Sequence, residues 1–290
     1  MDKLRAILLM KADFNFGNKL LFGHRLMKQM KKNGDIPAEQ HGSRNAHRSI
    51  EVALNRRLSS DISCQKRSDM MIAGVDAAFC YDRIVHSFAI MAARSKGMPY
   101  LPLYTMFKAI QSMEMQVRTS FGESRRTYGG ILNPPLQGTC QGNGASPVLW
   151  TLVSSMLLNA LKYKNTSSQV VSALSKEVLE LIGFVYVDDT DLIYMGKNYD
   201  KSRSLLDKLM MLVEGWKKNL WISGGTLRPE KCYWYAVKYE WVKGEWSYNK
   251  DKWKDINILD MEGKNKTIEE LHVEEAKEVV GVWLCPSGSN

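Results

Sequence analysis

LIGFVYVDDTDLIY, residues 181–194, is the stretch that decides the fold. Strand-forming residues flank the acidic run Asp188-Asp189-Thr190-Asp191 on both sides, which is typical of two strands joined by an acidic hairpin turn. Carboxylates that project from an otherwise apolar hairpin need charge compensation, and metal ions would provide it. An isolated Asp-Asp pair is more often a solvated turn, so the interpretation depends on what accompanies the pair.

A further carboxylate, Asp76, ends the apolar run of residues 70–75 and precedes an amphipathic segment, residues 81–95. This order predicts a strand, an aspartate and a helix. Two-metal phosphoryl transfer needs carboxylates on rigid strands, which hold two Mg²⁺ ions roughly 3.5–4 Å apart. Asp76 and the acidic hairpin therefore predict one shared metal site.

The rest of the chain alternates helical and strand patterns, which predicts an α+β fold. A loop rich in Gly and Pro spans residues 129–147. The predicted helices cover residues 16–32, 44–58, 148–161 and 201–220, and a predicted hairpin covers residues 233–241 and 246–248. Its aromatic residues alternate with lysines, a pattern that can hold single strands by stacking. For Trp234, Tyr235, Trp241 and Trp246 we instead expect packing across the strands.

Composition narrows the class of protein. The chain has 290 residues and 44% hydrophobic residues, enough for a sizeable core. Its net charge is +9, and residues 1–72 hold 14 Lys and Arg against 7 Asp and Glu, which favours a polyanionic partner. The five cysteines form no CxxC or Cys/His cluster, so we expect a reducing intracellular compartment, cytoplasm or nucleus, with an organelle not excluded. The apolar run Ala6 to Met10 is too short for a membrane span, and we expect no membrane partner.

The motifs, taken together, resemble those of the reverse transcriptases, in particular the non-LTR retrotransposon and group II intron enzymes. The resemblance runs in the family's order over nearly the whole chain. Its boxes are Asp76-Ala77-Ala78-Phe79-Cys80-Tyr81-Asp82, Gln141-Gly142-Asn143-Gly144-Ala145-Ser146-Pro147, Tyr186-Val187-Asp188-Asp189 and Leu227-Arg228-Pro229-Glu230-Lys231-Cys232. Fainter matches are Val280-Gly281-Val282 to the primer grip and residues 5–42 to the fingers.

The resemblance implies a right-hand polymerase palm, an antiparallel sheet with helices on one face, together with partial fingers. We expect residues 1–72 to be partial fingers and residues 73–250 the palm, with an inserted segment at about 100–140. Residues 251–290 would be the end of the palm with the primer grip, and the thumb would be missing or incomplete.

The resemblance also implies the metal ligands. Asp76 and Asp188 would bind both Mg²⁺ ions, or Mn²⁺ in their place. Asp189 would share the catalytic and metal site but should point the other way or serve a lesser role, because successive side chains of a strand alternate faces.

The nucleotide would be held by residues of the other boxes. Tyr81, five residues after Asp76, matches the aromatic steric gate that clashes with a 2′-hydroxyl, although without the motif a core aromatic is the commoner reading. Gln141 would hold the incoming dNTP, Gly142 would let the backbone approach the base pair, and Ser146 belongs to the same box. A plain loop-to-helix junction is the alternative for the glycines.

Six basic residues have predicted roles toward phosphates. Lys231 would protonate the leaving pyrophosphate as a general acid, although most lysines in such loops face water. Arg5 would bind the triphosphate through its guanidinium fork. Arg44 would follow template phosphates, as would Arg48, Arg56 and Arg57, although an arginine-rich helix face is more often solvated.

Tyr186 of the acidic box would contact nucleic acid. Asp82 is predicted to cap a helix start rather than to bind a metal. The expected partners are an RNA template, a DNA or RNA primer and dNTPs.

Two rival functions remain. An RNA-dependent RNA polymerase would share the palm, but it predicts a small or polar residue in place of Tyr81 and usually Gly in place of Val187. A catalytically inactive, truncated palm would only bind nucleic acid, and the intact carboxylates count against it.

Overall fold

The computed structural model describes residues 7–44, 47–130, 136–163, 167–172, 174–196, 205–251, 253, 255–260 and 262–288. The chain divides into two units: unit 1 comprises Met1–Ile36 and Phe79–Val153, and unit 2 comprises Pro37–Ala78 and Ser154–Asn290. These limits differ from the predicted boundaries at residues 72 and 250. Residues 37–72, expected in the fingers, belong to the same unit as the acidic hairpin.

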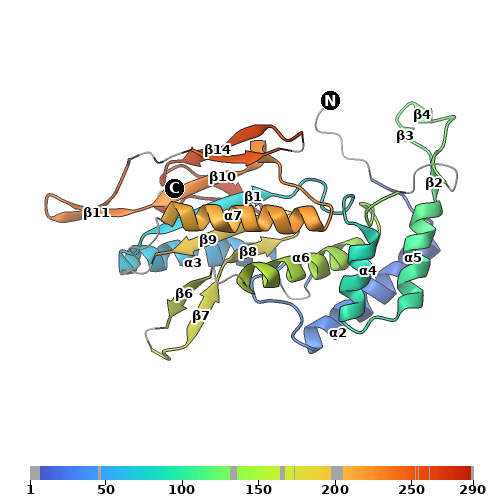
Figure 1. Cartoon of the computed structure of the whole chain (residues 1–290), viewed down its shortest axis with the longest axis horizontal. Coiled ribbons are helices and arrows are strands. Elements are labelled where there is room, and N and C mark those ends of the chain that lie inside the picture. Colours follow the sequence, from blue (N-terminus) through green and yellow to red (C-terminus); the bar gives the residue numbers. More distant parts are fainter. Residues whose placement is uncertain are drawn as a thin grey trace. The chain divides into compact units, whose positions relative to one another are not determined.

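Unit 2 contains a six-stranded sheet in the order β13-β14-β10-β1-β9-β8 (Figure 1). Its strands are β1 (Met70–Asp76), β8 (Gly183–Tyr186), β9 (Asp189–Met195), β10 (Tyr233–Val237), β13 (Ile256–Leu259) and β14 (Asn265–Leu271). All neighbours pair antiparallel except β10 and β14, which are parallel. The sheet is thus mixed and mainly antiparallel, close to the antiparallel sheet predicted.

Strand β1 is central, and its residues Met70 to Val75 are buried on both faces of the sheet. One face carries Ile72, Ile193 and Tyr235, which form a core cluster with Val52 of helix α3 (Ser49–Lys66). A continuous apolar run is what a strand covered on both faces requires.

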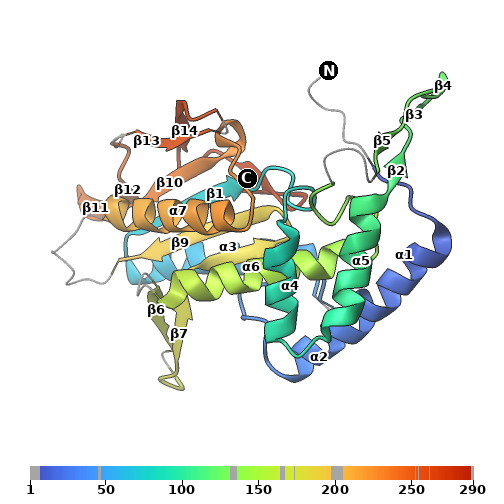
Figure 2. The ribbon, with the colours of Figure 1, turned by 45° about the vertical axis from the view of Figure 1, so that its right-hand side comes forward.

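The opposite face of the sheet is covered by helix α7 (Leu205–Ile222), where Lys208 Nζ donates a hydrogen bond to Tyr194 Oη over 2.7 Å. Helix α7 lies in front of the strands and α3 behind them (Figures 1 and 2). The expectation of helices on one face only was therefore wrong. The periodicity of the 44–58 segment predicted a helix but not the face of the sheet on which that helix packs.

Other elements complete unit 2. The final part of helix α6 (Ser146–Tyr163) packs here, since Asn219 Nδ2 donates to Leu157 O over 3.0 Å. Short elements follow the chain: β6 (Ser168–Val171), β7 (Val178–Leu181), the 3₁₀ helix η2 (Pro229–Lys231), β11 (Tyr239–Val242), β12 (Glu245–Tyr248), β15 (Lys277–Val279) and β16 (Val282–Leu284). In the β11–β12 hairpin Trp241 opposes Trp246 with ring centroids 5.3 Å apart, which confirms the predicted cross-strand packing for these two residues. Trp234 and Tyr235, expected in the same hairpin, lie instead on β10 of the six-stranded sheet.

Unit 1 is mainly helical. Its helices are α1 (Ala12–Asn18), the π-helix η1 (Lys19–Leu26), α2 (Met27–Lys32), α4 (His86–Ser95), α5 (Tyr100–Ser112) and the start of α6. Its strands are the two-residue β2 (Glu114–Met115), β3 (Arg118–Thr119), β4 (Gly122–Glu123) and β5 (Tyr128–Gly129). Among the described helices of both units, none combines the length and apolar character needed to cross a bilayer.

Candidate active site

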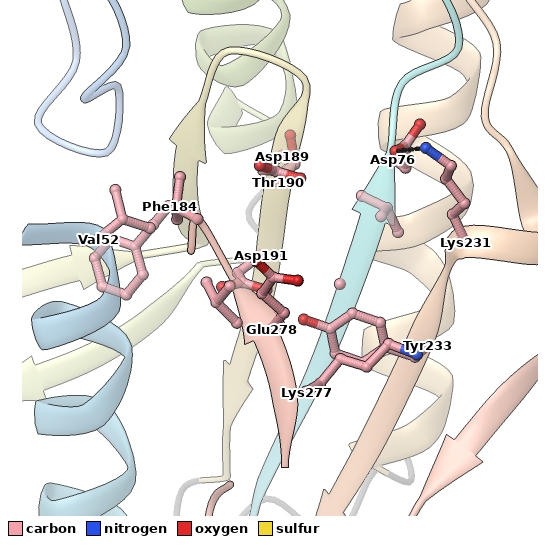
Figure 3. A pocket seen from close by; sticks show the side chains of 14 residues that line it. Val52, Asp76, Phe184, Asp189, Thr190, Asp191, Lys231, Tyr233, Lys277 and Glu278 are labelled. Atoms are coloured by element: carbon pink, nitrogen blue, oxygen red, sulfur yellow. Dashed lines mark hydrogen bonds and ion pairs between the residues drawn. The ribbon is translucent and has the colours of Figure 1, made fainter. Parts of the chain in front are cut away.

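The ends of two neighbouring strands bring two of the predicted carboxylates together. Asp76 is the last residue of β1 and Asp189 the first of β9, and the two are direct cross-strand partners (Figure 3). Directly opposed residues of a sheet present their side chains on the same face. The expectation that Asp189 turns away from Asp76 was therefore wrong, because the register and not the sequence order decides which acid faces Asp76.

Asp188 lies in the turn between β8 and β9. Tyr186 pairs with Asp189, so Val187 and Asp188 form a two-residue connection. Val187 has φ 57°, a left-handed conformation that costs a β-branched residue about 1–2 kcal/mol. The backbone of Ala77 donates to Asp188 O over 3.3 Å, which fixes the turn against the end of β1.

The three carboxylates repel one another. Partial burial, together with the negative charges of Asp188 and Asp76, raises the pKa of Asp189 to about 6. Burial also raises the pKa of Asp76, which Lys231 partly opposes. Carboxylate oxygens are the ligand atoms that Mg²⁺ and Mn²⁺ prefer, so the residue types at these strand ends are compatible with the metal ions that the sequence predicts.

Lys231 supplies a positive charge at the carboxylates. Its Nζ lies 3.3 Å from Asp76 Oδ2 (Figure 3), and the side chain is 45% exposed. The segment that leads to Lys231 is hydrogen-bonded to the end of β1. Arg228 N donates to Asp76 O over 3.0 Å, and Leu227 forms an isolated β-bridge with Ala77. Lys231 is therefore held beside the carboxylates while its ammonium group remains accessible to solvent.

A cavity of about 300 Å³ opens next to these groups. Asp76, Asp189 and Lys231 line it (Figure 3), and so do strand β15 and the next residue, Val280. Ionisable groups thus share a concave site with apolar residues of the sheet, an arrangement common in active sites.

Sequence reasoning missed a buried ion pair, one member of which, Asp191, lines the same cavity. Arg56 of α3, expected on a phosphate-facing or solvated helix face, is only 2% exposed and lies 2.9 Å from Asp191 Oδ1. Its Nη1 also donates to Tyr233 Oη over 2.7 Å. Burial disfavours the charge, yet the pKa of Arg56 lies above its usual value because Asp191 and Tyr233 are adjacent.

The signal for this pair was present in the strand period. Asp191 lies two residues after Asp189 and so shares its face. Gly74 opposes both Asp191 and Tyr233, and a Cβ there would lie 2.3 Å from Tyr233 Cζ. A glycine inside an otherwise apolar strand marked the place where the Tyr233 ring crosses the sheet.

Three of the predicted nucleotide-binding residues of unit 1, Tyr81, Gln141 and Gly142, lie in loops. Tyr81 is half-buried, and its carbonyl accepts a hydrogen bond from Thr139 N over 2.7 Å. Gln141 is half-buried as well. Gly142 has φ 110°, and a Cβ there would lie 2.4 Å from Leu8 O, so this glycine is needed for the close approach of two segments of the protein itself.

Two predictions for these loops need correction. Ser146 is 1% exposed, and its Oγ lies 2.7 Å from Thr139 O and 2.8 Å from Cys140 O, so it braces the loop instead of facing a nucleotide. Asp82 does not cap a helix start, because α4 begins at His86. Its Oδ1 instead accepts from Gln141 N over 3.2 Å.

Three further predicted residues remain. Arg5 lies outside the described residues. Tyr186 is partly buried and packs against the core cluster of unit 2. Arg44 donates from Nη1 to Gln40 O over 2.9 Å, and burial lowers its pKa, so part of its guanidinium group is bound within the protein.

No family model matches the chain. Among solved structures it is similar to telomerase from Candida albicans with a TWJ fragment of telomeric RNA, at TM-score 0.46 and 14% identity over 83% of this chain and 36% of that one. It is also similar to telomerase from Candida tropicalis with the same kind of fragment. The TM-score is 0.49 and the identity 15%, over 77% of this chain and 34% of that one. For apo telomerase from Candida tropicalis truncated from its C-terminal domain, the TM-score is 0.49 and the identity 13%, over 87% of this chain and 45% of that one.

The chain spans between about a third and just under half the length of these telomerase chains. Because every TM-score here is below 0.5, we base the functional conclusion on the residues of the site.

Proposed function

We propose that the chain is the polymerase core of a reverse transcriptase, an RNA-directed DNA polymerase that adds dNTPs to a primer 3′-hydroxyl. One observation carries the proposal: Asp76 and Asp189 are paired across adjacent strands, with Asp188 in the turn beside them and Lys231 at 3.3 Å from Asp76. The order of the sequence boxes supports a parent retroelement.

The three aspartates would hold Mg²⁺ or Mn²⁺. When bound, such ions stabilise the attacking and leaving oxygens of a nucleotidyl transfer. The contribution of the protein is rigidity, because Asp76 and Asp189 lie on the paired strands β1 and β9, and the Asp188 turn is bonded to Ala77. Positioned carboxylates need no reorganisation as charge develops.

Lys231 would serve as the general acid that donates a proton from Nζ to the leaving pyrophosphate. Its ammonium group already lies at the carboxylates and its exposure lets it move toward a phosphate. A positioned acid of this kind contributes about 10²–10⁴-fold to the rate.

Tyr81 would discriminate the sugar and favour dNTPs, with Gln141 at the base. An RNA template and a DNA or RNA primer fit the net charge of +9. These assignments rest on the motif positions in unit 1.

Primer extension on an RNA template with Mg²⁺, offering dNTPs or rNTPs, tests the proposal. We expect dNTP extension that Asp188→Asn abolishes and that Lys231→Met lowers by about 10²-fold or more. The matched control is Asp255→Asn, an exposed aspartate of unit 2 outside the site, which should retain full activity.

Two outcomes would support a rival. Preference for rNTPs would indicate an RNA polymerase, and Tyr81→Ala would then change little. RNA binding without extension, with equal affinity in the parent chain and Asp188→Asn, would indicate a palm that only binds nucleic acid.

A further inference from the structure

A second cluster of ligand-type side chains lies in unit 2. His41, His47 and Glu51 each offer one ligand atom, and these atoms all lie within 4.8 Å of one another. Glu51 Oε2 is 2.8 Å from His47 Nδ1 and 3.8 Å from His41 Nδ1. His47 and Glu51 are spaced i,i+4, with His47 two residues before α3 and Glu51 in its first turn, whereas His41 lies further back in the preceding loop.

His41 differs from the other two residues, because its ring nitrogen is buried without a hydrogen bond. Its side chain is 7% exposed, and its Nδ1 is buried with no hydrogen-bond partner. The ring packs edge-on against His47 and Phe184, with centroid distances of 5.5 and 6.1 Å. A buried imidazole nitrogen without a partner is costly unless something binds it.

The donor set indicates the class of ligand. Two imidazole nitrogens and one carboxylate oxygen suit Zn²⁺ and related transition ions, whereas Mg²⁺ prefers oxygen ligands throughout. Ligand bonds of about 2.0–2.1 Å in a tetrahedron place ligand atoms about 3.3 Å apart, and the distances of 2.8 and 3.8 Å from Glu51 Oε2 to the two imidazole nitrogens bracket this value. Burial, together with the nearby His47 and Arg44, lowers the pKa of His41 and so favours the neutral, ligating imidazole.

We propose that His41, His47 and Glu51 bind one divalent transition ion of the Zn²⁺ type, with a fourth position left for water. Arg44 opposes this binding electrostatically, but its Nη1 is engaged by Gln40 O at 2.9 Å.

The site would connect α3 to the strand that leads into the acidic hairpin. His41 N donates to Val185 O, and Val185 N donates to Glu39 O, each over 2.9 Å. Val185 belongs to β8, which ends directly before Val187 and Asp188. A bound ion would therefore fix the loop, the first turn of α3 and β8 to one another, independently of any catalysis at Asp76 and Asp188.

Titration of the metal-free full chain with Co²⁺, followed by displacement with Zn²⁺, tests the proposal. We expect one tight equivalent of Co²⁺ with visible d–d bands and no thiolate-to-metal charge-transfer band. His47→Gln and Glu51→Gln should each lower the affinity by about 100-fold or more, beyond the 10–100-fold typical of residues that only support ligands. Zn²⁺ should raise the unfolding midpoint of the parent chain but not of these variants.

The matched control is His272→Gln. His272 Nδ1 lies 3.6 Å from Glu274 Oε2 in an exposed pair, so the variant removes a histidine beside a glutamate without removing a ligand. It should bind like the parent chain, as should Asp188→Asn. Equal affinity in His47→Gln and the parent, a thiolate band, or loss of the tight equivalent in Asp188→Asn would each overturn the proposal.

Discussion

Removing the Arg56 guanidinium should destabilise unit 2 severely. Arg56→Met keeps an unbranched side chain of similar length but leaves Asp191, only 5% exposed, as an unpaired buried carboxylate. At 2.9 Å and an effective dielectric constant of ~20, the lost attraction is about 6 kcal/mol. Since relief of the arginine's own desolvation offsets part of it, we expect a loss of about 3–5 kcal/mol.

The double variant Arg56→Met/Asp191→Leu separates this cause from general disruption. With both charges gone, the burial penalty disappears, and a hydrophobic replacement of a buried pair is often neutral. Tyr233 Oη still loses its partner, which costs about 1–3 kcal/mol. We therefore expect the double variant to be more stable than Arg56→Met alone.

Native-state hydrogen exchange of the β9 and β10 amides, in increasing urea, measures the unfolding free energy of this unit rather than of the whole chain. The control is Arg57→Met, the neighbouring residue of α3, whose pair with Asp61 is exposed at a similar distance of 2.8 Å. Its loss should stay below about 1 kcal/mol. A loss below 1 kcal/mol in Arg56→Met, or a double variant less stable than Arg56→Met, would refute the reasoning.

Two further predictions concern the acidic hairpin. The pKa of Asp189 is about 6 in the folded chain, against 3.8 for an ordinary aspartate. Ionisation of Asp189 therefore lowers the free energy of unfolding as pH rises from about 4 to 6. Because the residue keeps part of its surface in water, we expect metal-free Asp189→Asn to gain only about 1 kcal/mol of stability above pH 6 and nothing below pH 4. Urea unfolding at several pH values checks this, and a gain that persists at pH 3 would contradict it. Val187→Gly should raise the free energy of unfolding by about 1 kcal/mol, and with it the urea midpoint, because glycine accepts the φ of 57°. The control Val185→Gly, at a fully buried strand position, should lower the midpoint. A lower midpoint in Val187→Gly would show that the turn is unstrained.

Local patterns in the sequence were sufficient to locate the carboxylates. An apolar run that ends in Asp76 and an acidic turn between strand formers are signals that extend over fewer than ten residues. Backbone geometry places such acids at strand ends whatever the rest of the fold does. The cross-strand packing of Trp241 and Trp246 was predictable for the same reason, because both residues belong to one hairpin.

The surroundings of individual side chains could be known only from the tertiary structure. Arg56 was expected to face phosphates or solvent, yet it is buried against Asp191, 135 residues further along the chain. Ser146 was assigned to the nucleotide from its motif, yet it is 1% exposed. The side of the sheet on which Asp189 lies is set by the register of β9 against β1. The approach of His41 to His47 and Glu51 is set by the path of the chain before α3.

The sequence by itself thus determined which residues carry charge and where strands, turns and helices end, because these follow from backbone preferences and hydrophobic period. Only the tertiary structure decided which charges are buried and which residues face one another. Burial and electrostatic interaction depend on distances between segments that the chain brings together only when it folds.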